Sequence, residues 1–443
     1  MLFREEGVSQ ESQGRGIAGL EDATELRLLV HQRLLELLNL SLLDKTPRET
    51  LRSEIRGVIG QILALEKRVL TPNQTDQLIE DVLDELLGLG PLEPLLKDDS
   101  VSDILINTHA KVYVERSGIL EETDVHFQDT RHLVRIINKI VSAIGRRVDE
   151  SQPMVDARLA DGSRVNAVIP PLAVDGPLVS IRKFSRTPIH LNRLVELKSI
   201  TEEMALLMRA IIKCRRNVLI SGGTGSGKTT LLNALSACID NRERIVTIED
   251  SAELQLQQPH ICRLETRPPN IEGRGEITQR DLVRNALRMR PDRIIVGEVR
   301  AGEAFDMLQA MNTGHDGSMT TVHANSPRDA LARVEQMIGM AGLDLSQRSI
   351  RQQIASAINV VIQLERMEDG KRRVISISEI VGMEHETVLM QEIFRFRRRG
   401  VDKDGVVIGD FETTGIRPQI MDLISARGVD LPALIFAAGR KSA

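Results

Sequence analysis

The chain has 443 residues, of which 41% are hydrophobic and 27% are charged, and its net charge is −5. This length indicates two or three domains with sizeable cores, and no apolar run approaches the ~18 residues that a membrane-spanning helix needs. The negative charge and the scarcity of aromatic residues (one Tyr, no Trp) argue against a dedicated nucleic-acid-binding protein. Three isolated cysteines predict neither a disulfide framework nor a zinc site.

The N-terminal region carries no visible chemistry. Residues 1–18 are polar and Gly-rich, so we expect them to be disordered, and they lack the apolar segment of a signal peptide. In residues 19–95 apolar side chains recur at helical spacing, which predicts a three-helix unit with a structural or docking role. The pairs Thr46-Pro47 and Thr71-Pro72 are typical helix starts, and a glycine-rich turn from Gly88 ends the third helix.

Residues 96–186 change to a period of two and predict an α+β (PAS-like) domain. The dipeptide Asp161-Gly162 is a strong signal for a hairpin between two of its strands. A linker is expected over 187–195. The expected strands are 103–106, 112–114, 164–169 and 178–182, and a helix is expected over 133–144.

Residues 196–443 alternate short apolar strands with helices, which predicts a mainly parallel sheet covered on both faces, with a helical C-terminal part. Ligands bind at the carboxyl ends of such strands. The expected strands are 218–220, 244–248, 293–296 and 318–322, and the expected helices lie around 230–239, 280–289, 303–312 and 327–340.

A complete P-loop, G-G-T-G-S-G-K-T, directly follows the first of these strands. Backbone N–H groups of such a loop surround phosphate oxygens, and the positive end of the next helix adds to their field. Lys228 should reach the β- and γ-phosphates, and the Thr229 hydroxyl should bind Mg²⁺. The predicted nucleoside triphosphate site comprises Gly222, Gly223, Thr224, Gly225, Ser226, Gly227, Lys228, Thr229 and Thr230.

Acidic or imidazole side chains follow three further strands of the same sheet. One carboxylate after a strand is more often a helix cap or a surface group, but their joint placement favours hydrolysis. Mg²⁺ binds carboxylates, the attacking water needs one to orient it, and arginine stabilises the charge of the transition state. The candidates are Glu249, Asp250, Glu253, Glu298, Arg300, His315 and His323.

The motif set resembles the secretion ATPases of type II and type IV secretion and of type IV pili. Thr247 to Glu253 looks like the Asp box of that family, Val296 to Arg300 like its Walker B with Glu for Asp, and Thr313 to His323 like its His box. The resemblance covers about residues 85–385. GTPases would carry an N-K-x-D motif and ABC ATPases an L-S-G-G-Q-type signature, and the sequence contains neither.

Finer features resemble the CpaF-like subgroup, the assembly motors of Tad/Flp pili. Ser251-Ala252 replaces the Pro-containing step of many pilus motors, which fits the CpaF-like and VirB11-like branches better. The matching stretches are 156–164, 181–184, 263–275, 288–292 and 311–314.

The resemblance implies a RecA-like domain that binds ATP and Mg²⁺ and works as a homohexamer. It implies that Glu253 activates water, that Glu298 supports Mg²⁺, and that His315 and His323 contact or sense phosphate. Arg164 and Arg182 of the α+β domain would also reach the nucleotide. The protein would lie in the cytoplasm and reach the inner membrane through platform proteins.

Our leading functional hypothesis is therefore an ATP-hydrolysing motor for Tad/Flp pilus assembly. A VirB11-like motor for type IV secretion or conjugation is the alternative, because the sequence separates the two poorly. A nucleic-acid translocase and a non-catalytic nucleotide-gated scaffold are weaker alternatives. The basic run Arg395 to Arg399 is interpreted as a solvated strand or loop edge rather than a nucleic-acid or lipid patch.

Overall fold

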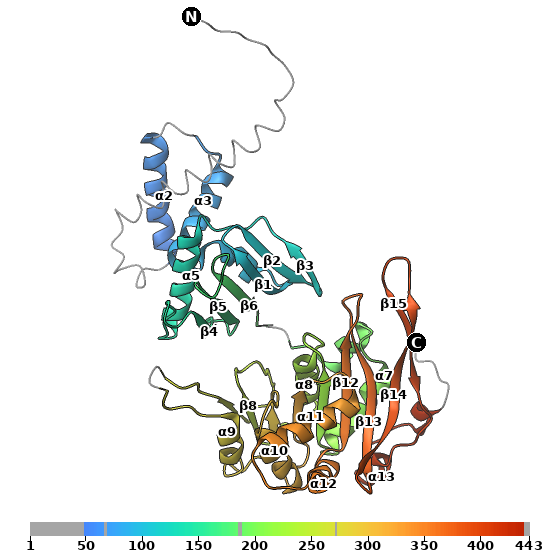
Figure 1. Cartoon of the computed structure of the whole chain (residues 1–443). Coiled ribbons are helices and arrows are strands. Elements are labelled where there is room, and N and C mark those ends of the chain that lie inside the picture. Colours follow the sequence, from blue (N-terminus) through green and yellow to red (C-terminus); the bar gives the residue numbers. More distant parts are fainter. Residues whose placement is uncertain (1–47, 66–68, 185–187, 271–272, 438–443) are drawn as a thin grey trace, which may run out of the picture. The chain divides into compact units, whose positions relative to one another are not determined.

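The computed structural model describes residues 48–65, 69–184, 188–270 and 273–437. The predicted disordered segment 1–18 and the first of the three predicted helices lie outside these ranges. The chain divides into unit 1, Met1–Lys183, and unit 2, Phe184–Ala443 (Figure 1). The expected linker 187–195 follows this boundary, and helix α6 (Leu191–Glu196) occupies its second half.

In unit 1, the helices α2 and α3 form a pair that packs through its own small core. The described helices of unit 1 are α2 (Arg48–Leu65), α3 (Pro72–Leu87), η2 (Gly90–Leu92), α4 (Glu93–Lys97) and α5 (Thr130–Ala143). As predicted, Thr71 caps α3 and Gly88 follows its last residue, and Thr71 forms a capping box with Gln74. Ile55 of α2 and Ile79 of α3 are fully buried between the two helices.

A six-stranded antiparallel sheet in the order β3-β2-β1-β6-β5-β4 forms the rest of unit 1. Its strands are β1 (Val101–Thr108), β2 (Lys111–Arg116), β3 (Ile119–Glu122), β4 (Met154–Arg158), β5 (Arg164–Val168) and β6 (Leu178–Arg182). Ile104 and Ile181 pack on Ile137 of α5, and β4 and β5 form the predicted hairpin. The prediction of an α+β fold for this part of the chain is confirmed. Strand β3 was not predicted, because all four of its residues are exposed and give no burial pattern.

Unit 2 is built on a nine-stranded sheet in the order β15-β14-β13-β12-β7-β11-β10-β8-β9. The six strands from β12 to β9 run parallel, and β13 to β15 extend the sheet antiparallel. Its strands are β7 (Val218–Gly222), β8 (Ile245–Glu249), β9 (Ile261–Glu265), β10 (Arg293–Val296), β11 (Met319–Val322), β12 (Val360–Arg366), β13 (Arg372–Glu384), β14 (Thr387–Val401) and β15 (Val407–Thr413).

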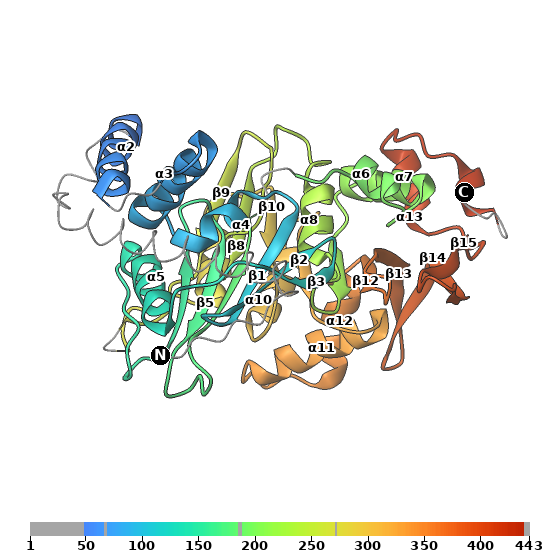
Figure 2. The same ribbon diagram turned by 90° about the horizontal axis from the view of Figure 1, so that it is seen from above.

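Helices cover both faces of the parallel part of this sheet. Val218 and Ile220 of β7 face the core formed with α6, α7, α8 and α13, whereas Leu219 faces the core formed with α9 to α12. Figure 2 shows α6 and α7 on one side of β12 and β13, and α11 and α12 on the other. The helices are α7 (Glu202–Lys213), α8 (Lys228–Ser236), α9 (Gln279–Ala286), α10 (Glu303–Asn312), α11 (Pro327–Met340), α12 (Gln347–Ala357), α13 (Ile420–Ala426) and η3 (Ala433–Phe436).

This arrangement confirms the predicted RecA-like domain but corrects its C-terminal part. We expected that part to be helical, whereas residues 360–413 form four strands, and α13 and η3 are the helices that follow within the described residues up to 437. The long strands β13 and β14 both carry charged residues among their apolar ones: Arg373 and Glu379 of β13 are buried, whereas Arg395 and Arg399 of β14 are exposed. The sequence pattern of these strands is therefore less clear than that of the short apolar strands.

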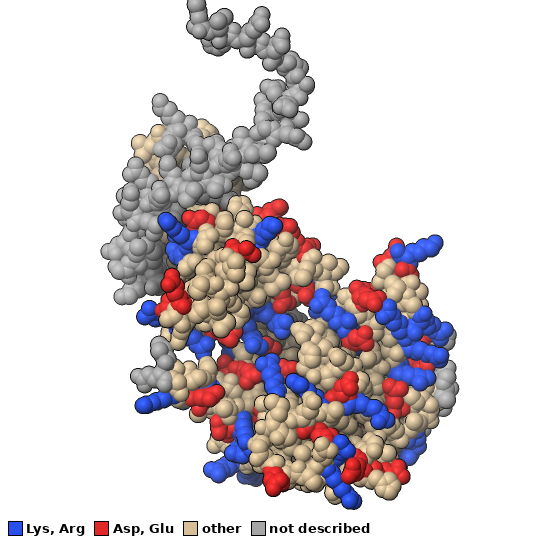
Figure 3. All heavy atoms as spheres, viewed as in Figure 1, with Lys and Arg blue, Asp and Glu red and all other residues tan. Residues whose placement is uncertain are grey.

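The basic run on β14 lies on an exposed strand next to carboxylates of β15. Figure 3 shows basic side chains gathered over this part of unit 2, with acidic ones among them. Arg395 lies 3.3 Å from Glu412, and Arg399 lies 2.6 Å from Asp410. These pairs agree with the interpretation of a solvated strand. Among the described residues, no helix is long and apolar enough to cross a membrane. The three cysteines are free.

Candidate active site

The predicted strand-end residues meet at one edge of the unit 2 sheet because β7, β8, β10 and β11 run parallel and in register. Val296 at the end of β10 pairs with Ile248 of β8 and with Thr320 of β11, so the four carboxyl ends lie at one edge, with β11 and β7 extending two and three residues beyond β10. The P-loop follows β7. Glu253, Glu298 and His323 follow β8, β10 and β11 at the same edge.

The P-loop has the backbone conformation that a phosphate cradle requires. Gly225 and Gly227 have φ angles of 68° and 96°, in the left-handed region where a side chain would be strained. A Cβ added to Gly222 would lie 2.7 Å from the carbonyl oxygen of Leu364. The Lys228 ammonium group donates to the carbonyl oxygens of Gly222 and Gly223, both at 3.0 Å, which holds it inside the loop.

The polar groups at the P-loop fit a nucleoside triphosphate with Mg²⁺. The Ser226 side chain is 1% exposed, and its Oγ has no hydrogen-bond partner among the described residues. Within those residues, no three His, Cys, Asp or Glu side chains gather closely enough to hold a metal by themselves. Mg²⁺ commonly binds through one or two protein ligands together with phosphate oxygens and water, so the predicted pair Thr229 and Glu298 does not require such a cluster.

The loop that carries Glu253 is held by a buried glutamate at the end of β8. Glu249 is 3% exposed, and its Oε1 accepts the backbone N–H groups of Glu253 and Leu254 at 2.8 and 2.9 Å. The other carboxylate oxygen, Oε2, is buried without a hydrogen-bond partner among the described residues. Burial raises the pKa of Glu249 to about 7, against the effect of the two N–H groups, which lower it.

This raised pKa predicts a stability that falls as pH rises. Between the ordinary value of 4.5 and about 7, folded Glu249 holds a proton that the unfolded chain releases, so the folded state loses stability across this window. The shift corresponds to about 3 kcal/mol. We expect the unfolding free energy of the wild type, relative to Glu249→Gln, to decrease by about this amount from pH 4.5 to about pH 8. Urea unfolding of both proteins across this range measures it, and parallel curves would refute it.

Glu298, the predicted Walker B residue, lies in an ion-pair network. Arg300 donates to Glu298 Oε2 at 2.6 Å, and its guanidinium group also lies 3.4 Å from Asp250. The backbone of the preceding Gly297 is fixed on both sides: its N–H donates to Ile248 O at 2.9 Å, and its carbonyl accepts from the Thr321 hydroxyl at 2.8 Å. Arg300 thus joins the acidic residues that follow β8 and β10.

The two histidines of the His box lie at opposite edges of the sheet. His323 follows β11 at the P-loop edge, whereas His315 precedes this strand. The ring Nδ1 of His315 lies 3.3 Å from the carbonyl oxygen of Ala310, and Met319, which starts β11, pairs with Val218 at the start of β7. A four-residue strand of roughly 13 Å separates the two edges. The structure therefore does not bring His315 to the P-loop edge of the same chain, and its predicted contact with the nucleotide stays a prediction.

Two arginines that sequence reasoning missed lie against the P-loop. Arg372 of β13 donates from Nε to the Gly225 carbonyl at 2.8 Å. The guanidinium group of Arg366 on β12 also lies close to Gly225: a Cβ added to that glycine would be 3.3 Å from Arg366 Nη1. Both belong to the β12–β13 hairpin in the C-terminal part, where the sequence carries only a short basic run and no recognised motif.

In unit 1, Arg158, Arg164 and Arg182 occupy directly opposite positions on the neighbouring strands β4, β5 and β6. Arg182 also lies 3.2 Å from Asp103. The register of the three strands thus places these arginines in one row across the sheet.

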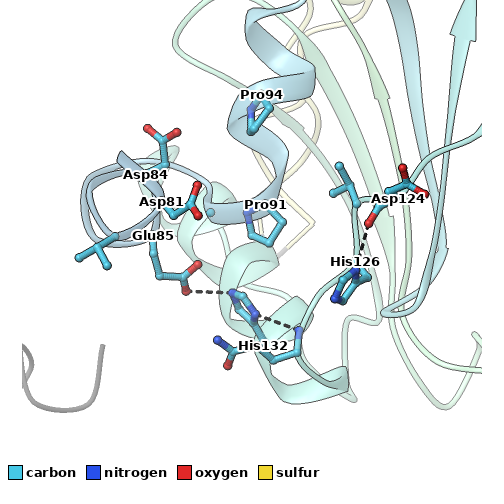
Figure 4. A pocket seen from close by; sticks show the side chains of 12 residues that line it. Asp81, Asp84, Glu85, Pro91, Pro94, Asp124, His126 and His132 are labelled. Atoms are coloured by element: carbon cyan, nitrogen blue, oxygen red, sulfur yellow. Dashed lines mark hydrogen bonds and ion pairs between the residues drawn. The ribbon is translucent and has the colours of Figure 1, made fainter. Parts of the chain in front are cut away.

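Unit 1 also contains a cavity of about 260 Å³ between α3, η2 and the loop before α5 (Figure 4). The buried His132 points to Glu85, with 2.9 Å between His132 Nε2 and Glu85 Oε1, and Arg135 lies 3.2 Å from the same oxygen. Lys97 pairs with Asp84 at 3.0 Å. Because these acidic groups pair with cations of the same unit, the cavity is explained as part of the packing of α3 on α5.

A P-loop between β7 and α8, facing a carboxylate-bearing edge, defines a P-loop protein of the nucleotide-hydrolysing class. A family model described as type II/IV secretion system protein matches residues 85–403. The chain belongs to this family of secretion ATPases. The narrower resemblance to CpaF-like motors stays a prediction.

Relatives named for conjugation and type IV secretion align with most of the matched region. A Mycobacterium tuberculosis protein provisionally named as a conjugal transfer protein is 41% identical over 300 residues, covering 66% of this chain and 85% of the relative. The conjugal transfer protein TrbB of Rhizobium radiobacter is 34% identical, covering 65% and 85%. The VirB11 protein of the Bartonella henselae type IV secretion system is 33% identical, covering 67% and 93%.

Solved structures of secretion ATPases also match. The VirB11 ATPase of Brucella suis is 28% identical, with a TM-score of 0.36 and coverage of 65% of this chain and 92% of that chain. The ATPase DotB of Legionella pneumophila is 23% identical, with a TM-score of 0.46 and coverage of 66% and 80%.

Proposed function

We propose that this chain is an ATP-hydrolysing motor of a type II/IV secretion machine. The observation that carries the proposal is the carboxyl edge of the unit 2 sheet, where the P-loop, Glu253, Glu298 and His323 follow four parallel strands. Phosphate binding alone would need only the P-loop. The added carboxylates provide what hydrolysis requires, a group for the attacking water and a group for the metal.

Each residue of this edge has a distinct task. Lys228, held inside the loop, contacts the β- and γ-phosphates, and Glu253 orients the attacking water and accepts its proton. When bound to Thr229 and Glu298, Mg²⁺ supplies positive charge against the phosphate oxygens. His323 reports on the γ-phosphate from the end of β11.

The arginine row of unit 1 supports a further part of the proposal. Arg164 and Arg182, which face each other on β5 and β6, are proposed to stabilise phosphate charge during hydrolysis. This assignment rests on the family resemblance, and the neighbouring positions of the two arginines on β5 and β6 are consistent with it. A homohexamer, attached from the cytoplasm to an inner-membrane platform, is proposed on the resemblance alone.

Two kinds of machine are candidates. The relatives named for conjugal transfer and VirB11 favour a type IV secretion or conjugation machine, whereas the motif stretches of the sequence favour Tad/Flp pilus assembly. The neighbouring genes distinguish them: prepilin and platform genes support the pilus, and conjugation-channel genes support type IV secretion. Strong ATPase stimulation by DNA with a steep salt dependence would instead support a nucleic-acid translocase.

We expect Lys228→Ala to reduce ATP turnover by at least about 10²–10³-fold, because it removes a fixed positive charge at the phosphates. Release of inorganic phosphate from Mg-ATP measures this. Lys213→Ala, at the exposed C-terminal end of α7, is the matched control and should keep wild-type turnover. Equal turnover in Lys228→Ala and the wild type would remove the P-loop as the site of hydrolysis.

A further inference from the structure

The burial of Glu249 is costly and needs an explanation. All five residues of β8 are buried, and the final one, Glu249, is the only one that ionises. A carboxylate in such surroundings loses its hydration, and only one of its two oxygens has hydrogen-bond partners among the described residues. The raised pKa of Glu249 reflects the same cost. An apolar residue would be cheaper here, so the carboxyl group must serve another purpose.

Glu249 holds the backbone of the loop formed by residues 250–260, which carries Glu253. Residues 250–260 contain no helix or strand, so this loop has no regular hydrogen bonds of its own to fix it. Side chains replace them: Glu249 accepts from Glu253 and Leu254, and Asn233 of α8 accepts the N–H of Gln255 at 2.9 Å. The N–H of Glu253 is thereby bound to the end of its own strand.

Glu249 also touches the loop that carries Glu298. A Cβ added to Gly297 would lie 3.0 Å from the Glu249 Cγ, which is tighter than most packing contacts, so a side chain at this position would require the two segments to shift by a few tenths of an ångström. Gly297 immediately precedes Glu298. The side chain of Glu249 therefore holds the backbone of Glu253 by a hydrogen bond and packs close to Gly297, the residue before Glu298.

We propose that Glu249 is a positioning residue that fixes the separation of the Glu253 and Glu298 loops, so that the water-activating and metal-supporting carboxylates face the P-loop together. This inference rests on the proposed function, because it assigns Glu249 a part in the same hydrolysis. Glu249 does not itself contact the reacting atoms in this account. It acts through two backbone N–H groups and through close packing on Gly297.

The test compares three substitutions of Glu249 by steady-state ATPase kinetics of the full chain. Glu249→Ala removes the acceptor, and Glu249→Asp keeps the carboxyl group but shortens the side chain by one methylene. We expect kcat to fall by about 10²-fold in both, as for a misplaced catalytic group, with KM for ATP nearly unchanged. Glu249→Gln keeps an acceptor oxygen in place and should retain kcat on the order of the wild type.

Glu379 is the matched control for a merely structural role. It is 5% exposed, and its two carboxylate oxygens accept the backbone N–H groups of Gln419 and Ile420, both at 2.7 Å. It therefore performs the same kind of backbone anchoring, at the start of α13. Glu379→Ala should lower thermal stability as Glu249→Ala does, yet leave kcat unchanged.

The outcomes separate the inference from the proposed function. Wild-type kcat in Glu249→Asp, or an equal loss of kcat in Glu379→Ala, would overturn the positioning role while ATP hydrolysis stands. If Glu249→Ala does not fold, the Asp and Gln variants decide: loss in the first and retention in the second supports the role, and any other pattern overturns it. A wild-type protein that releases no more phosphate than Lys228→Ala would overturn the proposed function and this inference with it.

Discussion

Glu253→Gln lowers the turnover number for ATP by about 10²–10⁴-fold and leaves KM for ATP almost unchanged, the loss expected when a general base is removed. Glutamine has the same size and can still accept a hydrogen bond, but it cannot take the proton of the attacking water. The backbone anchor of the loop, the N–H of Glu253 bound to Glu249, is unaffected by this change. Binding of the phosphates by the P-loop is also preserved.

Steady-state phosphate release and equilibrium binding of a fluorescent ATP analogue together measure this split. Glu335→Gln is the control. Glu335 of α11 pairs with Arg351 of α12 at 3.0 Å, and neither residue belongs to the loops at the P-loop edge. Its kcat should equal that of the wild type. A Glu253→Gln variant with wild-type kcat would transfer the role to another carboxylate of the edge, and the glutamine variant of Glu298 would then be measured next.

The sequence predicted the part of the fold in which motif and burial pattern coincide. The bounds of β10, α10 and α11 are those expected, because buried strands and capped amphipathic helices repeat with clear periods there. The missed strand β9, Ile261–Glu265, has no fully buried residue, and the missed helix α12 buries only three. Such elements depend on the sheet they join, and their own sequence gives little indication of them.

The parts of the site that could not be predicted are contacts between distant segments. Arg372 donates to Gly225, which is 147 residues away, and no local pattern records this pairing. His315 belongs to a recognised motif, but that motif spans β11 from one end to the other, so its two histidines are separated by the length of the strand. Glu249 was recognised as a strand-end acid, while its burial follows only from the packed loops around it.

The second large effect is expected at the edge of the sheet opposite the P-loop. Arg293 begins β10 and is 1% exposed, and its guanidinium group donates to both carboxylate oxygens of Glu243 at 2.7 and 2.8 Å. It also donates to the carbonyl oxygens of Ile212 and Gly317, at 2.9 and 3.3 Å. One side chain thus joins the end of α7, the start of β10 and the turn before β11.

Arg293→Met is expected to destabilise unit 2 by about 3–5 kcal/mol, because it removes a buried guanidinium group that donates to both oxygens of the mostly buried Glu243 and to two carbonyl groups, and leaves Arg215 as the remaining charged partner of Glu243. Burial tends to raise the pKa of Glu243, but hydrogen bonds from Arg293 and Arg215 outweigh it and hold that pKa below its ordinary value. Glu243 is therefore charged at neutral pH, and the methionine variant exposes the cost of that buried charge. Denaturant unfolding of the two proteins measures the difference.

A double variant distinguishes a lost ion pair from a damaged core. If the cost comes from the uncompensated charge, adding Glu243→Leu to Arg293→Met should restore part of the stability, because an apolar pair of similar volume often replaces a buried ion pair without net loss. Arg242→Met is the surface control, since its side chain is 90% exposed and pairs only with Asp240 among the described residues, and it should unfold like the wild type. Wild-type stability in Arg293→Met, or a double variant less stable than the single one, would contradict this account.

Arg293 lies a full strand length from the P-loop edge. The fraction of Arg293→Met that remains folded should therefore bind ATP with wild-type affinity, because distant sites act independently. The residues that stabilise unit 2 and the residues that bind ATP thus lie at opposite ends of the same strands.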